Sequence, residues 1–257
     1  MSKYLLSFGK LGFYETIRPP FFPFLIGIFS FLMNKAIAGH LIVILSSLTS
    51  IFLVYLISKE IFGYKKSLIP VFLFSIAPTF VFYSSRILNG IPSMTLTLLA
   101  VYLFVKNKNL FFVGLIAGFS ALTRFPNILI IFSLSLFILI ETIKTEKLKQ
   151  AILTTTKKCS LLLSGFILPL IPYLIFNHLK FSNIIFPFQQ ASKTISIVSQ
   201  SVNQGIFYYP TAILLESIFL AFFFVGLFFI FREKKKQNPI FLFFIISLTF
   251  MIYYSTV

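Results

Sequence analysis

The stretch Gly39–Ser58, GHLIVILSSLTSIFLVYLIS, decides the fold because it contains no Asp, Glu, Lys or Arg. A bilayer core about 30 Å thick needs roughly 20 apolar residues in a helix that crosses it. Lys59 and Glu60 follow at once and end the apolar run. The run is continuous rather than alternating, and a lipid-exposed backbone must be helical or a closed barrel. The stretch therefore predicts a transmembrane helix.

The composition extends this prediction to the whole chain. Hydrophobic residues make up 58% of the sequence, charged residues make up 11%, and the mean hydropathy is +0.98. Soluble domains are about 45–50% apolar and about 25% charged. A chain this apolar cannot bury its surface in one water-soluble core. We expect an all-α, polytopic transmembrane helical bundle in the cell membrane, forming a single domain over residues 1–257.

Further apolar runs predict about eight spans plus one interfacial helix. The predicted spans are Gly39–Ser58, Ser67–Ser85, Ile91–Val105, Leu110–Leu122, Asn127–Ile140, Ser160–Phe176, Thr211–Phe231 and Pro239–Thr256. The stretch Phe21–Met33 is shorter and follows Pro19-Pro20, so it either lies along the membrane surface or makes a short crossing.

The basic residues between the spans set the orientation. One set of alternate loops holds 14 of the 22 Lys and Arg residues, and the other set holds 8. Loops rich in Lys and Arg stay in the cytoplasm. We therefore place Arg86, Arg124, residues 1–38 and the polar loop 177–210 outside.

The net charge of +16 would suggest a nucleic-acid partner in a soluble protein. Here the charge lies in short clusters beside the spans, which indicates topology and contact with anionic membrane lipid. We expect no nucleic-acid partner. The single cysteine, Cys159, excludes a disulfide or a cysteine-based metal site within the chain.

Acidic residues are scarce, since the chain has six Glu and no Asp. Four of them accompany cytoplasmic lysines and are interpreted as local charge balance: Glu60, Glu141, Glu146 and Glu233. Glu216 lies in the first turns of a predicted span, where an acid is either functional or reaches out to water. Glu15 is either a substrate-contacting carboxylate or a partner of Arg18.

Arg86 and Arg124 each end a predicted span on the outer side, beside aromatic or proline residues. A guanidinium binds phosphate through a planar fork of donors. Two such groups at the outer membrane rim are suited to hold a lipid phosphate. The alternative is ordinary anchoring at the interface.

Four stretches, taken in order, are similar to one known superfamily: Arg18-Pro19-Pro20-Phe21-Phe22-Pro23-Phe24, Ile61-Phe62-Gly63-Tyr64-Lys65-Lys66, Tyr83–Pro92 and Gly114–Pro126. The chain resembles the GT-C integral-membrane glycosyltransferases. The branch it resembles contains the dolichyl-phosphate-mannose protein mannosyltransferases and the lipid A aminoarabinose transferase. In that family the Pro-Pro element precedes a helix on the outer membrane surface, which favours an interfacial Phe21–Met33.

The resemblance implies transfer of a sugar from a polyprenyl- or dolichyl-phosphate donor to a glycan, lipid or protein acceptor. A family carboxylate acts as base toward the acceptor or, in some branches, helps to bind a divalent cation. On this basis Glu15 is the catalytic candidate. The candidates for substrate binding are Arg18, Arg86, Arg124 and Glu216.

Two departures from the family pattern point to a reduced, truncated or inactive member. The family's acidic pair lies ahead of the Pro-Pro element, a region that would precede Met1 here. Asn89-Gly90 stands where the family has an acid, and an amide cannot take up a proton as a carboxylate does. The rival interpretation is a non-enzymatic multi-pass protein, either a transporter or a scaffold subunit.

Overall fold

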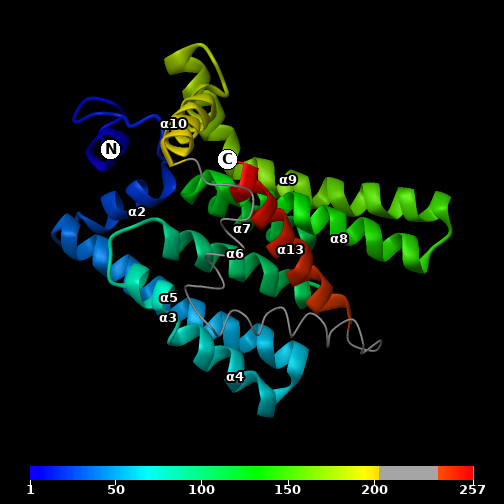
Figure 1. The fold of residues 1–257 in the computed structure, drawn as a ribbon. Helices are drawn as coiled ribbons and strands as arrows, with labels where there is room; N and C mark the ends of the chain where they lie inside the picture. The colour runs from blue at the N-terminus through cyan, green and yellow to red at the C-terminus, as the bar shows by residue number, and fades with distance from the viewer. Residues whose placement is uncertain (203–236, 257) are drawn as a thin grey trace.

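The computed structural model describes residues 1–202 and 237–256, and within these ranges all regular structure is helical (Figure 1). The all-α prediction is confirmed. In chain order the elements are α1 (Ser2–Leu6), α2 (Phe21–Phe29), α3 (Lys35–Phe62), α4 (Tyr64–Ser75), α5 (Pro78–Ser84), α6 (Gly90–Val105), α7 (Leu110–Thr123), the 3-10 turn η1 (Phe125–Ile128), α8 (Leu129–Thr145), α9 (Leu148–Phe181), α10 (Phe186–Val202) and α13 (Gln237–Thr256).

Among the described residues, three helical stretches are long and apolar enough to cross a membrane: α3, Phe125–Thr145 and α9. The helices α4 and α5 form a fourth span if the bent pair is counted as one. The predicted count of about eight spans is therefore not confirmed. The helices α6, with 16 residues, and α7, with 14, are shorter apolar helices. The predicted span Thr211–Phe231 lies outside the described residues.

The predicted span Ser67–Ser85 is broken into α4 and α5, which meet at an angle of 63°. Ala77 adopts an extended conformation, with φ −59° and ψ 124°, immediately before Pro78. A residue that precedes proline is driven out of the helical region by a clash with the ring. Pro78 then begins α5, where its missing N–H is tolerated.

The region predicted as a polar outer loop, 177–210, is largely helical where it is described. The helix α9 runs on to Phe181, and α10 occupies Phe186–Val202. Ser182, in the left-handed conformation with φ 52°, separates the two helices. The loop prediction was wrong for this part because Ser and Gln side chains were interpreted as loop residues. Only the tertiary context shows that they lie on a helix.

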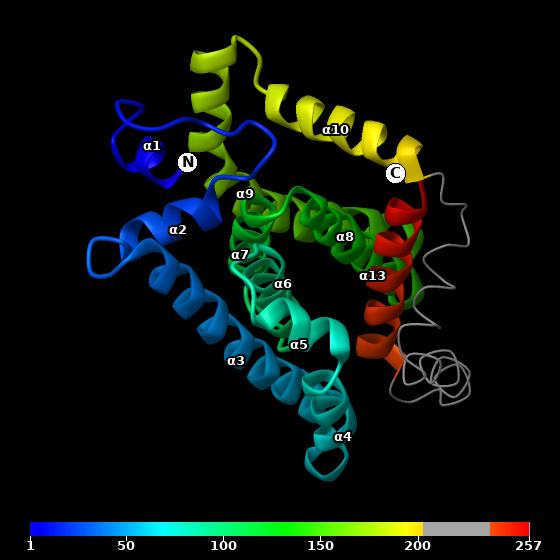
Figure 2. The ribbon, with the colours of Figure 1, turned by 60° about the vertical axis from the view of Figure 1, so that its left-hand side comes forward.

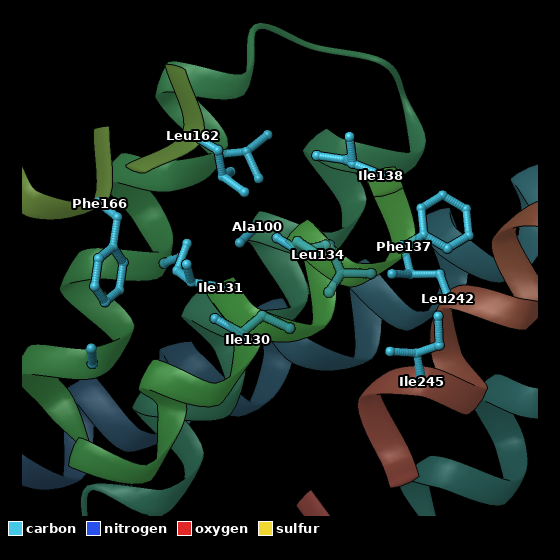
Figure 3. Close-up of a cluster of buried hydrophobic side chains, with 14 of the residues drawn as sticks. Ala100, Ile130, Ile131, Leu134, Phe137, Ile138, Leu162, Phe166, Leu242 and Ile245 are labelled. Atoms are coloured by element: carbon cyan, nitrogen blue, oxygen red, sulfur yellow. The ribbon is translucent and has the colours of Figure 1, made fainter. Parts of the chain in front are cut away.

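The core forms where α7 packs against α6 and α9. Gly114 and Gly118 of α7 face α9, and a Cβ atom added at Gly114 would overlap the carbonyl oxygen of Leu162. A Cβ added at Gly165 of α9 would likewise overlap the carbonyl oxygen of Phe111. Small residues of this kind let two helix backbones touch. Figure 3 shows buried side chains of this cluster, including Leu162, Phe166 and Ile130.

Buried polar side chains join α6, α7 and η1. The side-chain Nδ2 of Asn127 donates to Ser120 Oγ at 2.7 Å, to Thr97 Oγ1 at 3.2 Å and to the Ser93 carbonyl oxygen at 3.4 Å. Asn127 is 6% exposed. Because its amide donors are paired in the interior, Asn127 fixes η1 against the two helices.

The C-terminal ends of α3 and α6 are joined by an ion pair, with Lys106 Nζ 2.6 Å from Glu60 Oε1. The hydrogen bond from Lys106 to Glu60 raises the pKa of this lysine. The lysine-bearing α3–α4 turn thus lies at the same end as the α6–α7 turn. Figure 2 shows α4 at one end of the molecule, while α1, α2 and α10 surround the other.

Candidate functional site

Two turns that carry the predicted arginines lie together at the end of the bundle remote from Glu60 and Lys106. Asn89 Nδ2 donates a hydrogen bond of 2.9 Å to the carbonyl oxygen of Thr123. This bond joins the turn before α6 to the end of α7. We call residues 86–89 and 123–127 the arginine rim. The two segments are 34 positions apart in sequence at this contact, yet one hydrogen bond holds them in register.

Both arginines of the rim are exposed. The Arg86 guanidinium carbon lies 4.1 Å from the centroid of the Phe82 ring, which is cation–π geometry. Arg124 caps the C-terminus of α7 in an extended conformation, with φ −150° and ψ 118°. It lies near Tyr253 of α13. The rim therefore presents two guanidinium groups beside aromatic rings.

Local sequence explains why α7 ends at this point. Pro126 has no N–H to donate to the Leu122 carbonyl oxygen, so the α-helical hydrogen bonds cannot continue through it. The backbone then makes one turn of 3-10 helix, in which the Asn127 N–H donates to the Arg124 carbonyl oxygen at 3.0 Å. The side chain of Asn127 is hydrogen-bonded in the core, so this backbone bond holds the main chain of Arg124 in place.

The segment with Glu15 and Arg18 lies at this same end. Phe21 of α2 contacts Phe119 of α7, with ring centroids 4.9 Å apart. Arg18 Nε lies 3.0 Å from Glu15 Oε1. Of the two alternatives for Glu15, partnership with Arg18 is the one that the geometry shows. Glu15 is also the only acid at this end among the described residues.

The helix α2 begins at Phe21 as expected, and it is nine residues long. At 1.5 Å per residue, such a helix is about 13 Å long and cannot cross a hydrocarbon core of about 30 Å. The length favours the interfacial prediction over a crossing.

Sequence reasoning missed a group of buried polar side chains next to this segment. The phenol oxygens of Tyr14 and Tyr173 and the amide oxygen of Asn177 are buried and have no hydrogen-bond partner. Burial, reinforced by the neighbouring Tyr173, raises the pKa of the Tyr14 phenol. Leaving such an atom unpaired costs about 1–3 kcal/mol. The only signal in the sequence was the presence of Tyr173 and Asn177 at the end of the predicted span Ser160–Phe176.

Lys180 completes this group at the end of α9. Its ammonium lies 4.1 Å from the ring centroid of Tyr4 and 4.7 Å from that of Tyr14. It also donates a hydrogen bond of 2.6 Å to the Tyr4 hydroxyl. Nothing in the sequence pairs residues 4 and 180, because the contact is purely tertiary.

The helix α10 reaches the arginine rim through aromatic contacts. Phe188 lies 4.5 Å from Phe125 and 6.1 Å from Tyr173, measured between ring centroids. Phe125 follows Arg124 directly, so the start of α10 borders the rim.

Of the predicted site residues, the structure brings Arg86 and Arg124 into one rim and places Glu15 and Arg18 at the same end. Glu216 lies outside the described residues. Nowhere in residues 1–202 and 237–256 do three His, Cys, Asp or Glu side chains come together as a metal site. Glu15, the one acid at this end among the described residues, is engaged with Arg18.

Comparison with known proteins gave one family. The family model described as dolichyl-phosphate-mannose-protein mannosyltransferase matches residues 17–176. The match begins just before α2, ends within α9, and includes Arg18, Arg86 and Arg124. No curated protein and no solved structure matched the chain.

Proposed function

Because this chain belongs to the dolichyl-phosphate-mannose-protein mannosyltransferase family, whose members are membrane glycosyltransferases of the GT-C type, we propose that it uses a polyprenyl-phosphate sugar as donor. The acceptor is a hydroxyl of a glycan, lipid or protein on the outer face of the cell membrane. The observation that supports this proposal is the hydrogen bond from Asn89 to Thr123, which holds two arginine-bearing turns together.

The donor phosphate binds at the arginine rim in this proposal. A polyprenyl phosphate keeps its chain in lipid and its charged group at the membrane surface, where Arg86 and Arg124 are exposed. Guanidinium groups bind phosphate oxygens through charge-assisted hydrogen bonds. Because negative charge builds up on the phosphate as it leaves, fixed positive groups stabilise the transition state more than the ground state.

The transfer step exchanges one bond for another. The acceptor oxygen forms a bond to C1 of the sugar, and the bond between C1 and the phosphate oxygen breaks. The bonding pair leaves with the polyprenyl phosphate, and the acceptor proton passes to a carboxylate. We assign that base to Glu15, with Arg18 orienting its carboxylate through their ion pair.

The proposal includes two further assignments, one to Glu216 and one to α10. Substrate binding is also assigned to Glu216, which lies outside the described residues. The helix α10 recognises the acceptor or the sugar, because its first turn borders Arg124 through Phe125.

Equilibrium binding of tritiated dolichyl-phosphate mannose to the purified full chain in lipid nanodiscs tests the donor site. Arg86→Ala and Arg124→Ala should each raise Kd roughly tenfold, since a hydrogen bond to a charged group contributes about 1.5–3 kcal/mol. Lys66→Ala, an exposed lysine at the opposite end, is the matched control and should leave Kd unchanged. If both arginine variants bind like the wild type, the rim is not the donor site.

The assignment of Glu15 is tested by replacing its carboxylate with the amide of glutamine. Glu15→Gln should lower transfer at saturating donor at least about 100-fold while donor binding stays intact, as expected on loss of a general base. Transfer at the wild-type rate would remove Glu15 from the chemistry without affecting the donor site.

A further inference from the structure

We propose that Lys180 is a positioning residue, which fixes the segment bearing Glu15 and Arg18 to the C-terminal end of α9. This inference rests on the proposed function for its catalytic consequence, although the docking itself can be measured without any transfer. Figure 2 shows the N-terminal segment beside the upper end of α9.

The first observation is an aromatic box around the Lys180 ammonium. The rings of Tyr4 and Tyr14 come from the N-terminal segment, at 4.1 Å and 4.7 Å from the ammonium. The rings of Phe176 and Phe181 come from α9, each with its centroid at 5.6 Å. A cation within about 6 Å of a ring centroid is attracted by the face of the ring. The Lys180 ammonium therefore attracts rings of the N-terminal segment and rings of α9 at the same time.

The second observation is direct packing of Tyr14 on α9. Its ring centroid lies 5.0 Å from that of Phe176 and 6.0 Å from that of Phe181. Tyr4 lies 5.7 Å from Tyr14 on the side of the segment. Tyr14 is thus enclosed by aromatic rings and lies within reach of Lys180. Glu15 is the next residue in the chain. The packing of Tyr14 on α9 therefore also holds the backbone of Glu15 in place.

The third observation is that other polar atoms between the N-terminal segment and α9 lack well-formed hydrogen bonds. The buried oxygens of Tyr14, Tyr173 and Asn177 find no hydrogen-bond partner. These atoms oppose docking, because each loses its bonds to water on burial. The favourable interactions are ring packing, the Lys180 charge and the 2.6 Å hydrogen bond from Lys180 to the Tyr4 hydroxyl. The substitution Lys180→Met removes the last two and leaves the rings in place.

The segment has a second attachment, which Lys180 does not control. The helix α1 packs closely on α2, where a Cβ added at Gly27 would lie 2.8 Å from Leu6 Cδ1. Loss of Lys180 should therefore release residues 7–18 locally rather than unfold the bundle. Local release and unfolding of the bundle can therefore be told apart by where the chain is cleaved.

The test compares Lys180→Met, Lys180→Arg and the control Lys35→Met in the full chain in nanodiscs. Lys180→Met keeps much of the length of the side chain and removes its charge, whereas Lys180→Arg keeps the charge. The first readout is the rate of tryptic cleavage after Lys10, which is exposed and tracks the open population of the segment. We expect Lys180→Met to raise this rate roughly tenfold, with Lys180→Arg and Lys35→Met close to the wild type.

The second readout separates positioning from binding. With dolichyl-phosphate mannose as donor, Lys180→Met should lower kcat about tenfold with little change in the donor KM, and Lys180→Arg should restore kcat. Cleavage unchanged in Lys180→Met would overturn the inference whatever the activity. Faster cleavage with an unchanged kcat would overturn the positioning role. If even the wild type transfers no sugar, the proposed function fails, while the cleavage rates still decide the docking.

Discussion

Asn89 Nδ2 and the carbonyl oxygen of Thr123 lie 2.9 Å apart, and their hydrogen bond is what makes one rim out of two turns. The amide stands where the resemblance to GT-C enzymes called for an acid. A carboxylate accepts hydrogen bonds but cannot donate one when it is ionised. Asparagine at this position therefore supplies a donor to the α7 terminus that an ionised acid would not.

We predict that Asn89→Ala weakens both the fold and donor binding. The loss of one hydrogen bond should cost about 1 kcal/mol of unfolding free energy. The affinity for dolichyl-phosphate mannose should fall at least about threefold, because the two arginines are no longer held in register. Asn109→Ala is the control, since Asn109 Oδ1 accepts one backbone hydrogen bond of 2.9 Å at the other end of α7. It should destabilise the fold similarly, by about 1 kcal/mol, without changing the donor Kd.

Gly114→Ala should be strongly destabilising, because the new methyl group overlaps the backbone of Leu162 and cannot be relieved by a rotamer change. We expect a loss of about 3 kcal/mol in SDS titration followed by circular dichroism. Gly90→Ala is the same substitution at a helix start where nothing lies within 4 Å of the added atom. It should be neutral or stabilise the fold by up to about 1 kcal/mol. Equal effects of the two substitutions would argue against close backbone packing.

Asn127→Leu should destabilise the bundle by about 1–3 kcal/mol, since the hydroxyls of Ser120 and Thr97 lose a donor in the interior. Donor binding should fall as well, because η1 carries the base of Arg124. The same SDS titration and nanodisc binding assay measure both effects. A variant that is less stable but binds donor normally would show that η1 does not govern the rim.

Tyr173→Phe should leave stability within about 1 kcal/mol of the wild type, because its buried hydroxyl lies beside Tyr14 and Asn177 but forms no hydrogen bond of good geometry with either. Loss of more than about 1 kcal/mol in the SDS titration would mean that the hydroxyl forms a bond in the membrane.

The orientation can be measured by cysteine labelling, since Cys159 is the single cysteine of the chain. In a Cys159→Ser background, Ser85→Cys beside the arginine rim should react with a membrane-impermeant maleimide added to intact cells. Lys66→Cys, at the opposite end of the bundle, should react only after permeabilisation. The reverse pattern would place the rim in the cytoplasm and contradict both the topology and the outer-face reaction.

The sequence predicted some elements well, and physical reasons separate them from the failures. Gly39–Ser58 lies within α3 because an uninterrupted apolar run with charged ends has one stable arrangement in lipid. The bend at Ala77-Pro78 was expected from the proline but not from hydropathy, which does not distinguish a straight span from a broken one. The start of α2 was predicted, whereas the 34-residue length of α9 was not, since its polar ends read as loops.

The candidate site divides in the same way. Arg86 and Arg124 were identifiable from their place at the ends of apolar runs, and the alternation of spans predicted that they share a face. Their connection through Asn89 depends on a side chain reaching a backbone carbonyl in another helix, which no local pattern encodes. The box around Lys180 joins positions 176 residues apart at its hydrogen bond to Tyr4, so only the folded chain shows it.

The glycine contacts between α7 and α9 have a mechanical consequence. Helices whose backbones touch cannot easily slide or tilt past one another. We therefore expect α7 and α9 to tilt together in the bilayer. Arg124 is at the end of one member and Lys180 is near the end of the other. When a thicker or thinner bilayer changes the inclination of α9, we expect Arg124 and the lysine that contacts Tyr14 to move together. We therefore expect the spacing between Arg124 and Lys180 to depend little on the thickness of the bilayer.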